Sequence, residues 1–247
     1  MKLDMRRDSF PTKHLLDHGY VRLVDHMGSD LSIVRAARVS YDAAWRAGEN
    51  EGSDTRLIEY LWEHKHSTPF EAVTFSFEVH APIFVFRQWH RHRTQSYNEL
   101  SARYRELPEE FYVPAREHLL QQSTNNKQGR AGEPFSEDEY ADMVNIIRET
   151  NEDAFNVYRS LLARGVAREL ARSVLPVSTY STMFTTMNLL NLLKFLTLRA
   201  DPHAQYEIRV YAEAMVELIR PFCPVAVAAW EKGNNQRDRQ ALQETDQ

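Results

Sequence analysis

The sequence predicts a single α+β domain, built from a mixed sheet with long flanking helices. Segments typical of half-buried strands occur at 20–27, 73–79 and 180–187. Helical segments with an apolar stripe separate and follow them, and no internal repeat divides the chain. At 247 residues the chain is long enough for one sizeable core. We therefore expect one domain over residues 1–233 and a polar, frayed tail at 234–247.

In the first half of the chain, capping residues and a proline mark the predicted helices. The turn at 28–30 follows the first strand and caps a helix over 31–37. A second helix is expected to begin at Ser53 or Asp54. It should end before Pro69, because the residue before a proline is disfavoured in the helical conformation.

The apolar segment 82–91 fits a strand as well as a helix. If it is helical, Gln88, Arg91 and His92 share one face. The polar stretch 123–134, rich in asparagine and glycine, predicts a surface loop.

The second half of the chain is predicted to be mainly helical. A capping box at 136–139 opens a long helix, and a further helix ends at 168–172. After the last strand, a helix is expected over 188–199. A final long helix over 204–220 is broken by Pro221.

Composition excludes several classes of protein. Hydrophobic residues make up 43% and charged residues 26%, as in ordinary soluble proteins. The formal net charge of -5 argues against a general nucleic-acid binder. No apolar run approaches the roughly 20 residues that span a bilayer, and a single cysteine fits a reducing compartment. We therefore expect a cytoplasmic protein that binds neither nucleic acid nor membrane.

A cationic cluster directly follows the apolar run at 82–86. Its polar residues are Arg87, Arg91, His92, Arg93, Glu99, Ser101 and Arg103. If the second part is extended, its alternate residues share one face. Arginines beside hydrogen-bonding side chains suit an anionic ligand, whereas a solvated basic turn is the simpler alternative.

The exact sequence of this cluster favours a ligand site over a solvated basic turn. The pattern R-H-R-x-x-S-x-N-E-x-S-x-R-Y from Arg91 to Tyr104 resembles the signature of the flavin-dependent thymidylate synthases. His66–Glu71 resembles the family segment H-x-T-P-F-E, and Leu198–Ala204 resembles L-R-x-x-x-H-A. The resemblance covers most of the chain from Ser40 to Gln205. It implies a ThyX-like fold and an enzyme that reductively methylates dUMP to dTMP. Methylenetetrahydrofolate would donate the carbon unit, and NADPH would supply reducing equivalents through FAD.

The resemblance also implies the site residues. Arg199 is the catalytic residue expected to stabilise negative charge that builds on the uracil edge. The residues expected to bind dUMP are Gln88, Arg91, Glu99, Ser101, Ala102, Arg103, Arg172 and Arg199. The residues expected to bind FAD are Ser40, His66, Thr68, Glu71, Arg91, His92, Arg93, Glu99, Asn188 and Lys194. The family forms homotetramers with active sites between subunits, so some of these residues would serve a neighbouring subunit.

One departure from the family pattern concerns the flavin. Where family members carry asparagine-x-arginine, this chain has Asn188-Leu189-Leu190. Lys194 restores a cation one turn later, and we expect it to replace the missing guanidinium with less directional bonding.

Three other kinds of site are weaker. His64 and His66 lie two residues apart and do not face each other on a helix, so no metal is expected. Ser101 lacks the flanking glycines of a nucleophile elbow. Cys223 lies between two prolines and has no histidine near it in sequence that would favour a thiolate, so we expect a buried structural thiol.

A different class of function uses the same cluster. A non-catalytic nucleotide- or RNA-binding module would stack bases on Trp89, Tyr97 and Tyr104. Composition alone does not choose between this module and the enzyme, whereas the motif favours the enzyme.

Overall fold

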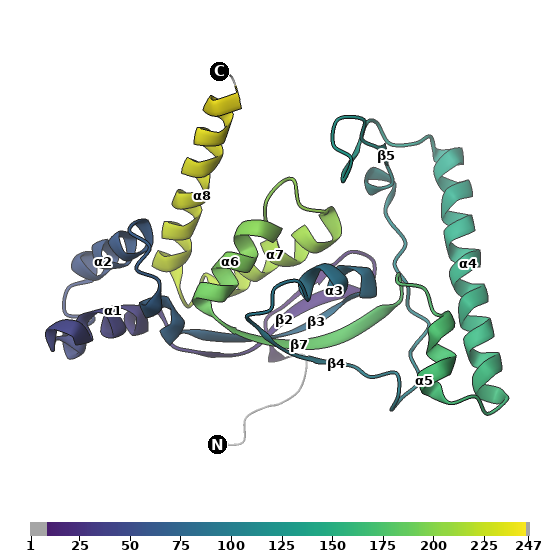
Figure 1. Ribbon diagram of the computed structural model, residues 1–247, viewed down its shortest axis with the longest axis horizontal. Coiled ribbons are helices and arrows are strands. Elements are labelled where there is room, and N and C mark those ends of the chain that lie inside the picture. The colour runs from purple at the N-terminus through teal and green to yellow at the C-terminus, as the bar shows by residue number, and fades with distance from the viewer. Residues whose placement is uncertain (1–8, 246–247) are drawn as a thin grey trace.

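The computed structural model describes residues 9–245, with side chains for residues 9–235. The first eight residues of the expected domain and the last two of the expected tail lie outside the described residues. Figure 1 shows a sheet in the middle, with two helices beyond one end and a long helix beyond the other. The two are α1 (Asp30–Arg38) and α2 (Glu51–Glu63), and the long one is α4 (Glu137–Ala163). Within the described residues, no helix is both long and apolar enough to cross a membrane.

The main sheet has five strands in the order β1-β2-β3-β7-β4. They are β1 (Thr12–Leu15), β2 (Gly19–Met27), β3 (Thr74–Pro82), β7 (Tyr180–Asn188) and β4 (Ser96–Glu99). Every neighbouring pair is antiparallel. The single α+β domain is confirmed, but the expectation of a mixed sheet is wrong. The connections from β2 to β3 and from β4 to β7 start and finish at the same end of the strands, which makes each pair antiparallel.

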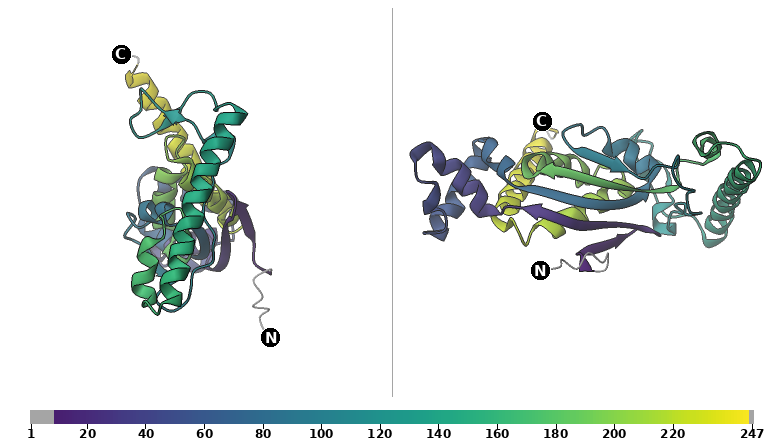
Figure 2. Two further views of the ribbon diagram at one scale, coloured as in Figure 1. Left: turned by 90° about the vertical axis from the view of Figure 1, so that its right-hand side faces the viewer. Right: turned by 90° about the horizontal axis from the view of Figure 1, so that it is seen from below.

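One face of the sheet is covered by helices. Strand β3 points Phe75, Phe77 and Val79 to that face, where all three are fully buried. The helices above it are α3 (Ile83–Trp89), α6 (Leu189–Arg199) and α7 (Tyr206–Ile219), as Figure 1 shows. Seen from below in Figure 2, the strands lie in front of these helices and the opposite face carries no helix.

The predicted helix boundaries hold to within a few residues. Ser29 caps α1 with a capping box, as the turn at 28–30 predicts. Helix α2 begins earlier than expected, because the Asn50 side chain accepts a hydrogen bond from the Ser53 amide at 2.9 Å. Ser136 opens α4 with the predicted capping box.

The ambiguous segment 82–91 is a short helix. Helix α3 ends at Trp89, so Arg91 and His92 follow its last turn. The face that a longer helix would give to Gln88, Arg91 and His92 is therefore absent. Pro82 ends the strand and stands at the N-cap of α3, where its missing N–H costs nothing.

Two regions differ from the expectation. The predicted loop at 123–134 holds part of a small hairpin of β5 (Gln121–Gln122) and β6 (Arg130–Ala131). The tail that the sequence predicts to be frayed belongs, as far as it is described, to α8 (Pro224–Thr245), which contains no glycine or proline after Gly233. A short helix, α5 (Arg168–Ala171), packs against α4 around a second small core.

Candidate active site

Arg199 lies in the last turn of α6 and is half-buried. Its Nε donates to Nε2 of His92 at 2.9 Å, and its Nη2 donates to the backbone carbonyl of Gln88 at 3.4 Å. The structure thus brings three predicted site residues together from two segments that are about a hundred positions apart in sequence (Gln88 and His92 are 111 and 107 positions from Arg199). We call these three residues the Arg199 cluster.

His92 is held as a neutral acceptor. Burial and the charge of Arg199 lower its pKa from 6.5 to about 4. Because Nε2 accepts the hydrogen bond from Arg199, the proton of the neutral ring resides on Nδ1. Tyr97 donates its hydroxyl to the His92 carbonyl at 2.5 Å, and burial raises the pKa of Tyr97 to about 12. Arg199 therefore keeps the only positive charge within its cluster.

A second group of predicted dUMP residues gathers beside α5. Arg103 Nε lies 3.3 Å from a carboxylate oxygen of Glu169, and Arg172 Nε donates to the Glu169 carbonyl at 3.3 Å. The backbone N–H of Arg103 donates to Ser101 Oγ at 3.3 Å, while Ala102 beside it is buried. We call Ser101, Ala102, Arg103 and Arg172 the α5 group. Figures 1 and 2 show α5 at the end that carries α4, away from α6.

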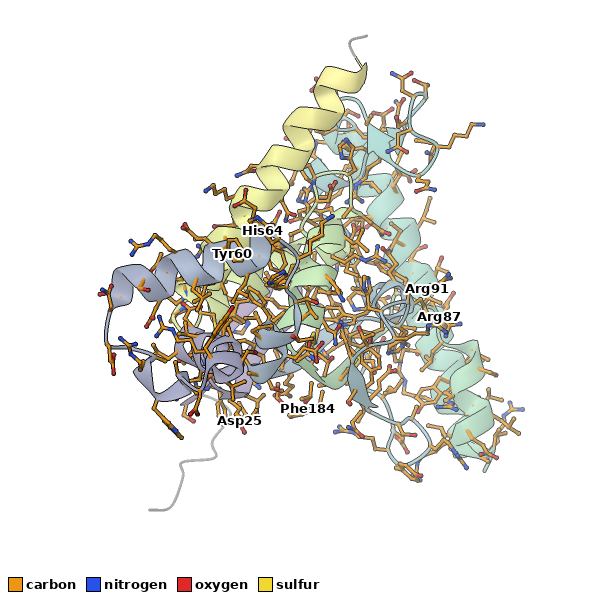
Figure 3. All side chains as sticks on the ribbon, turned by 60° about the vertical axis from the view of Figure 1, so that its left-hand side comes forward. Asp25, Tyr60, His64, Arg87, Arg91 and Phe184 are labelled. Carbon is orange, nitrogen blue, oxygen red and sulfur yellow. The ribbon has the colours of Figure 1, made fainter. Side chains whose placement is uncertain are left out.

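The remaining charged residues of the motif lie open on the surface. Arg91, Arg93 and Glu99 are all exposed. Glu99 ends the edge strand β4, where it pairs with Met183. In Figure 3, Arg91 lies away from His64, the residue that follows α2.

The predicted flavin residues before β3 adjoin the start of α6. Thr68 and Glu71 lie in the 3₁₀ turn η4 (Thr68–Ala72), which begins two residues after the exposed His66. This turn packs against α6. Asn188 caps α6 by accepting from the Asn191 amide at 2.9 Å, so its side-chain oxygen already has a structural role. Ser40 is exposed in a separate 3₁₀ turn after α1.

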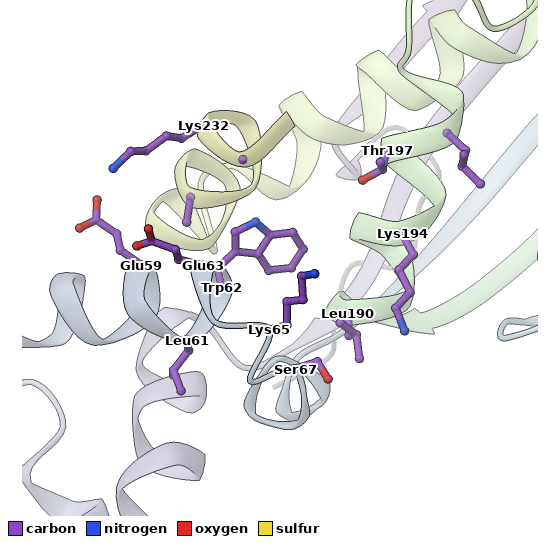
Figure 4. Close-up of a pocket in the computed structure, with 13 residues that line it drawn as sticks. Glu59, Leu61, Trp62, Glu63, Lys65, Ser67, Leu190, Lys194, Thr197 and Lys232 are labelled. Atoms are coloured by element: carbon purple, nitrogen blue, oxygen red, sulfur yellow. The ribbon is translucent and has the colours of Figure 1, made fainter. Parts of the chain in front are cut away.

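A cavity of about 740 Å³ opens between α2, α6 and α8. It contains Lys194, the lysine that the sequence proposes for the flavin, together with Leu190. Figure 4 shows Trp62 and Lys65 next to each other on the side of the cavity opposite Lys194. A Cβ on Gly233 would approach Trp62 Nε1 to 3.0 Å, so glycine leaves room for the indole.

Sequence reasoning missed Trp62 and Lys65. Trp62 belongs to the apolar stripe of the predicted helix, and Lys65 is a charged residue just beyond it. Nothing in their spacing indicates a pocket. Lys65 adopts a left-handed backbone conformation, with φ of 59°, at the turn after α2. This conformation is visible only in the structure.

Cys223 matches the expected structural thiol. It is fully buried, and burial together with the nearby Asp30 carboxylate raises its pKa to about 12. The thiol is protonated near neutral pH and is unsuited to nucleophilic attack. Within residues 9–235, no three histidine, cysteine, aspartate or glutamate side chains are grouped so that they could hold a metal ion.

Comparison with known proteins agrees over most of the chain. The family described as thymidylate synthase complementing protein matches residues 22–225. A flavin-dependent thymidylate synthase of Gluconobacter oxydans is 47% identical over 226 residues, which cover 90% of this chain and 73% of that protein. A Thermus thermophilus protein of the same name is 48% identical over 218 residues, with 88% and 77% covered.

A solved structure shares both fold and sequence. The crystal structure of the UMP/dUMP methylase PolB from Streptomyces cacaoi, bound with 5-Br dUMP, superposes with a TM-score of 0.81 at 40% identity. The match covers 89% of this chain and 97% of the PolB chain. This chain therefore belongs to the thymidylate synthase complementing protein family, the flavin-dependent thymidylate synthases.

Proposed function

We propose that this protein methylates dUMP to dTMP and that Arg199 is its catalytic residue. The observation that supports the proposal is the hydrogen bond that the guanidinium of Arg199 donates to His92, a residue from another of the family motifs. Its relatives are named flavin-dependent thymidylate synthases, and PolB was solved with dUMP and UMP analogues. These names favour an enzyme over the non-catalytic nucleotide- or RNA-binding module.

The chemistry fits a polarised uracil ring. The 5-carbon of uracil is a poor nucleophile until negative charge can spread onto the ring oxygens. Arg199 donates from Nε to His92 and from Nη2 to the Gln88 carbonyl, which leaves its Nη1 edge for a ligand. A fixed cation that meets growing charge stabilises the transition state more than the ground state. With Cys223 buried and protonated, covalent activation by that thiol is disfavoured.

The remaining dUMP residues would hold the nucleotide. Arg172 and Arg103 offer exposed guanidinium groups that suit a phosphate. Ser101 and the backbone around Ala102 add donors beside them. Arg91, Gln88 and Glu99 remain proposals for contacts to the sugar and base.

FAD is the flavin that we propose, with NADPH and methylenetetrahydrofolate as co-substrates. The cavity beside Lys194 supports this proposal, because an indole face and lysine side chains line it, although Glu59 and Glu63 also lie at its wall. Lys65 and Lys194 would face an anionic part, and Trp62 a flat ring. When bound, the flavin supplies hydride.

The other proposed flavin residues divide into two sets. Thr68, Glu71 and Asn188 adjoin α6 near its start, and His92 contacts Arg199 in its last turn. The others lie on separate segments: Ser40, His66, Arg91, Arg93 and Glu99.

We also propose a homotetramer with active sites between subunits. The argument is the distance between the Arg199 cluster and the α5 group within one chain (Figures 1 and 2). A nucleotide that contacts both would take the α5 group from a second copy. A cytoplasmic location, and the absence of nucleic-acid and membrane partners, stay predictions from composition.

The visible spectrum of the purified protein tests this function. We expect a bound yellow chromophore that heat releases as FAD, and its reduction by NADPH. dTMP should form when dUMP and methylenetetrahydrofolate are added. Colourless protein that binds no added FAD and binds RNA in a salt-sensitive manner would establish the alternative instead.

A further inference from the structure

A buried carboxylate lies next to the Arg199 cluster and is absent from the predicted site. Glu207, in the first turn of α7, is only 2% exposed. It accepts three hydrogen bonds, from Tyr112 Oη at 3.0 Å, Arg130 Nη1 at 2.9 Å and Gln205 Nε2 at 2.9 Å. Arg130, a permanent cation, forms an ion pair with this buried side chain.

The carboxylate sets the direction of a chain of amides. A carboxylate can only accept, so Gln205 must turn its NH₂ toward Glu207 and its carbonyl oxygen away. That carbonyl oxygen accepts from Gln88 Nε2 at 2.5 Å. The orientation of both amides follows from this network and from no other contact of their side chains within the described residues. Among the residues that the structure describes, no group donates to the carbonyl oxygen of Gln88, Oε1.

We propose that Glu207, acting through Gln205, fixes Gln88 so that it presents a hydrogen-bond acceptor to dUMP. The inference rests on the proposed function, and Glu207 and Gln205 are positioning residues. Gln88 lies at the candidate uracil site, because its own backbone carbonyl accepts from Arg199. The matching group on the ligand is a donor, either a sugar hydroxyl or the imide N–H of uracil.

The hairpin region has a defined part in this arrangement. Arg130 on β6 is the cation at one end of the hydrogen-bonded series Arg130–Glu207–Gln205–Gln88. Its guanidinium also lies 5.7 Å from the Tyr206 ring centroid. From the same segment of the chain, His118 stacks on Tyr206, with centroids 3.5 Å apart. Residues 116–131 are therefore docked on the start of α7, next to Gln205. The surface stretch that lies outside the family signature would thus support the nucleotide site.

The substitution Glu207→Gln tests the direction of the chain. Its oxygen would still face Tyr112 and Arg130, so its NH₂ would face Gln205. Gln205 would then reverse, Gln88 would reverse in turn, and the ligand would meet a donor instead of an acceptor. We expect Kd for dUMP, measured by titration calorimetry on the flavin-loaded protein, to rise about tenfold. Glu109→Gln, which removes the exposed ion pair with Arg159, is the matched control and should leave Kd unchanged.

A double-mutant cycle separates positioning from a loss of fold. Gln88→Ala should raise Kd about tenfold in the wild-type background and less than about threefold beside Glu207→Gln. Equal effects in the two backgrounds would overturn the proposal, since a purely structural role predicts additivity. If Glu207→Gln does not fold, the exposed Gln205→Leu breaks the same chain and enters the same cycle.

The same binding measurements identify the donor group on the ligand and test the proposed function. Two analogues are compared, one that lacks the 3′-hydroxyl and one that carries a methyl group on N3. For the analogue that lacks the donor bound by Gln88, Gln88→Ala should no longer raise Kd. If Gln88→Ala still raises Kd for both analogues, Gln88 does not accept from dUMP. If the wild-type protein itself binds no dUMP, the proposed function fails instead.

Discussion

Arg199 and Arg172 are both expected at the nucleotide, yet the chain holds them in contrasting surroundings. Arg199 is half-buried and makes contacts with His92 and Gln88. Arg172 is exposed and donates to the carbonyl of Glu169, three residues before it. A guanidinium that is fixed before the ligand arrives suits charge stabilisation, whereas an exposed one suits neutralising a phosphate.

The largest effect is expected at the fixed arginine. Arg199→Lys keeps the charge but loses the planar fork, so kcat should fall on the order of 10², the scale of one preorganised donor. Reduction of the flavin by NADPH without dUMP should stay near the wild-type rate, and stopped-flow absorbance measures it. If turnover stays within a few-fold of wild type, Arg199 only caps α6, where it would contribute roughly 0.3–1 kcal/mol to stability.

The exposed arginine should affect binding more than turnover. Arg172→Gln is expected to raise Kd for dUMP about tenfold, with a weaker dependence on salt than in the wild type. Co-refolding Arg172→Gln with Arg199→Lys then tests the boundary directly. If a site combines residues from two subunits, mixed oligomers should regain activity above the sum of the two parents. Activity equal to that sum would place both arginines in one subunit's site.

A smaller and more selective effect is expected at Lys194. Lys194 lies one turn after Leu190, the position at which family members carry an arginine, and it lines the cavity beside α2. Lys194→Ala should weaken FAD several-fold and leave dUMP affinity nearly unchanged. The exposed Lys127 on the distant hairpin is a control that removes an equal charge. Unchanged FAD affinity would show that Lys194 does not replace the guanidinium.

The smallest effect concerns the neutral state of His92. Its pKa is lowered in the folded protein from 6.5 to about 4, so the unfolded chain binds the proton more readily between these values. The stability that His92 contributes is therefore complete above about pH 6.5 and is lost as the pH falls toward 4. We expect Tm to fall more for the wild type than for His92→Gln between about pH 7 and about pH 5. Parallel curves would mean that His92 titrates alike in both states.

The predictability of the molecule follows the range of the interactions involved. The capping box at Ser136 and the strand from Gly19 to Met27 depend on neighbours in the chain, and the sequence was sufficient for both. The direction of the sheet and the end of α3 depend on how distant segments return, and the expectations there were wrong or open.

The same holds for the site. The motif predicted residues that do meet, such as Arg199 and His92, although a resemblance and not local physics supplied their roles. Glu207 and Arg130 escaped notice because 77 residues separate them and each reads as an ordinary surface charge. Burial sets Glu207 apart from a surface carboxylate, and burial at this position depends on segments distant in the sequence.

The position of α8 has a consequence for synthesis on the ribosome. Asp30 at the start of α1 caps α8, accepting from the amides of Val225 at 2.8 Å and Ala226 at 3.1 Å, and the Val225 contact spans 195 residues. The interior strand β7 also joins the sheet late, between β3 and β4, which are synthesised long before it. The nascent chain therefore exposes an incomplete sheet until most of it has emerged, and such non-local pairing folds slowly. We expect ribosome-bound chains that stop before residue 224 to remain sensitive to protease.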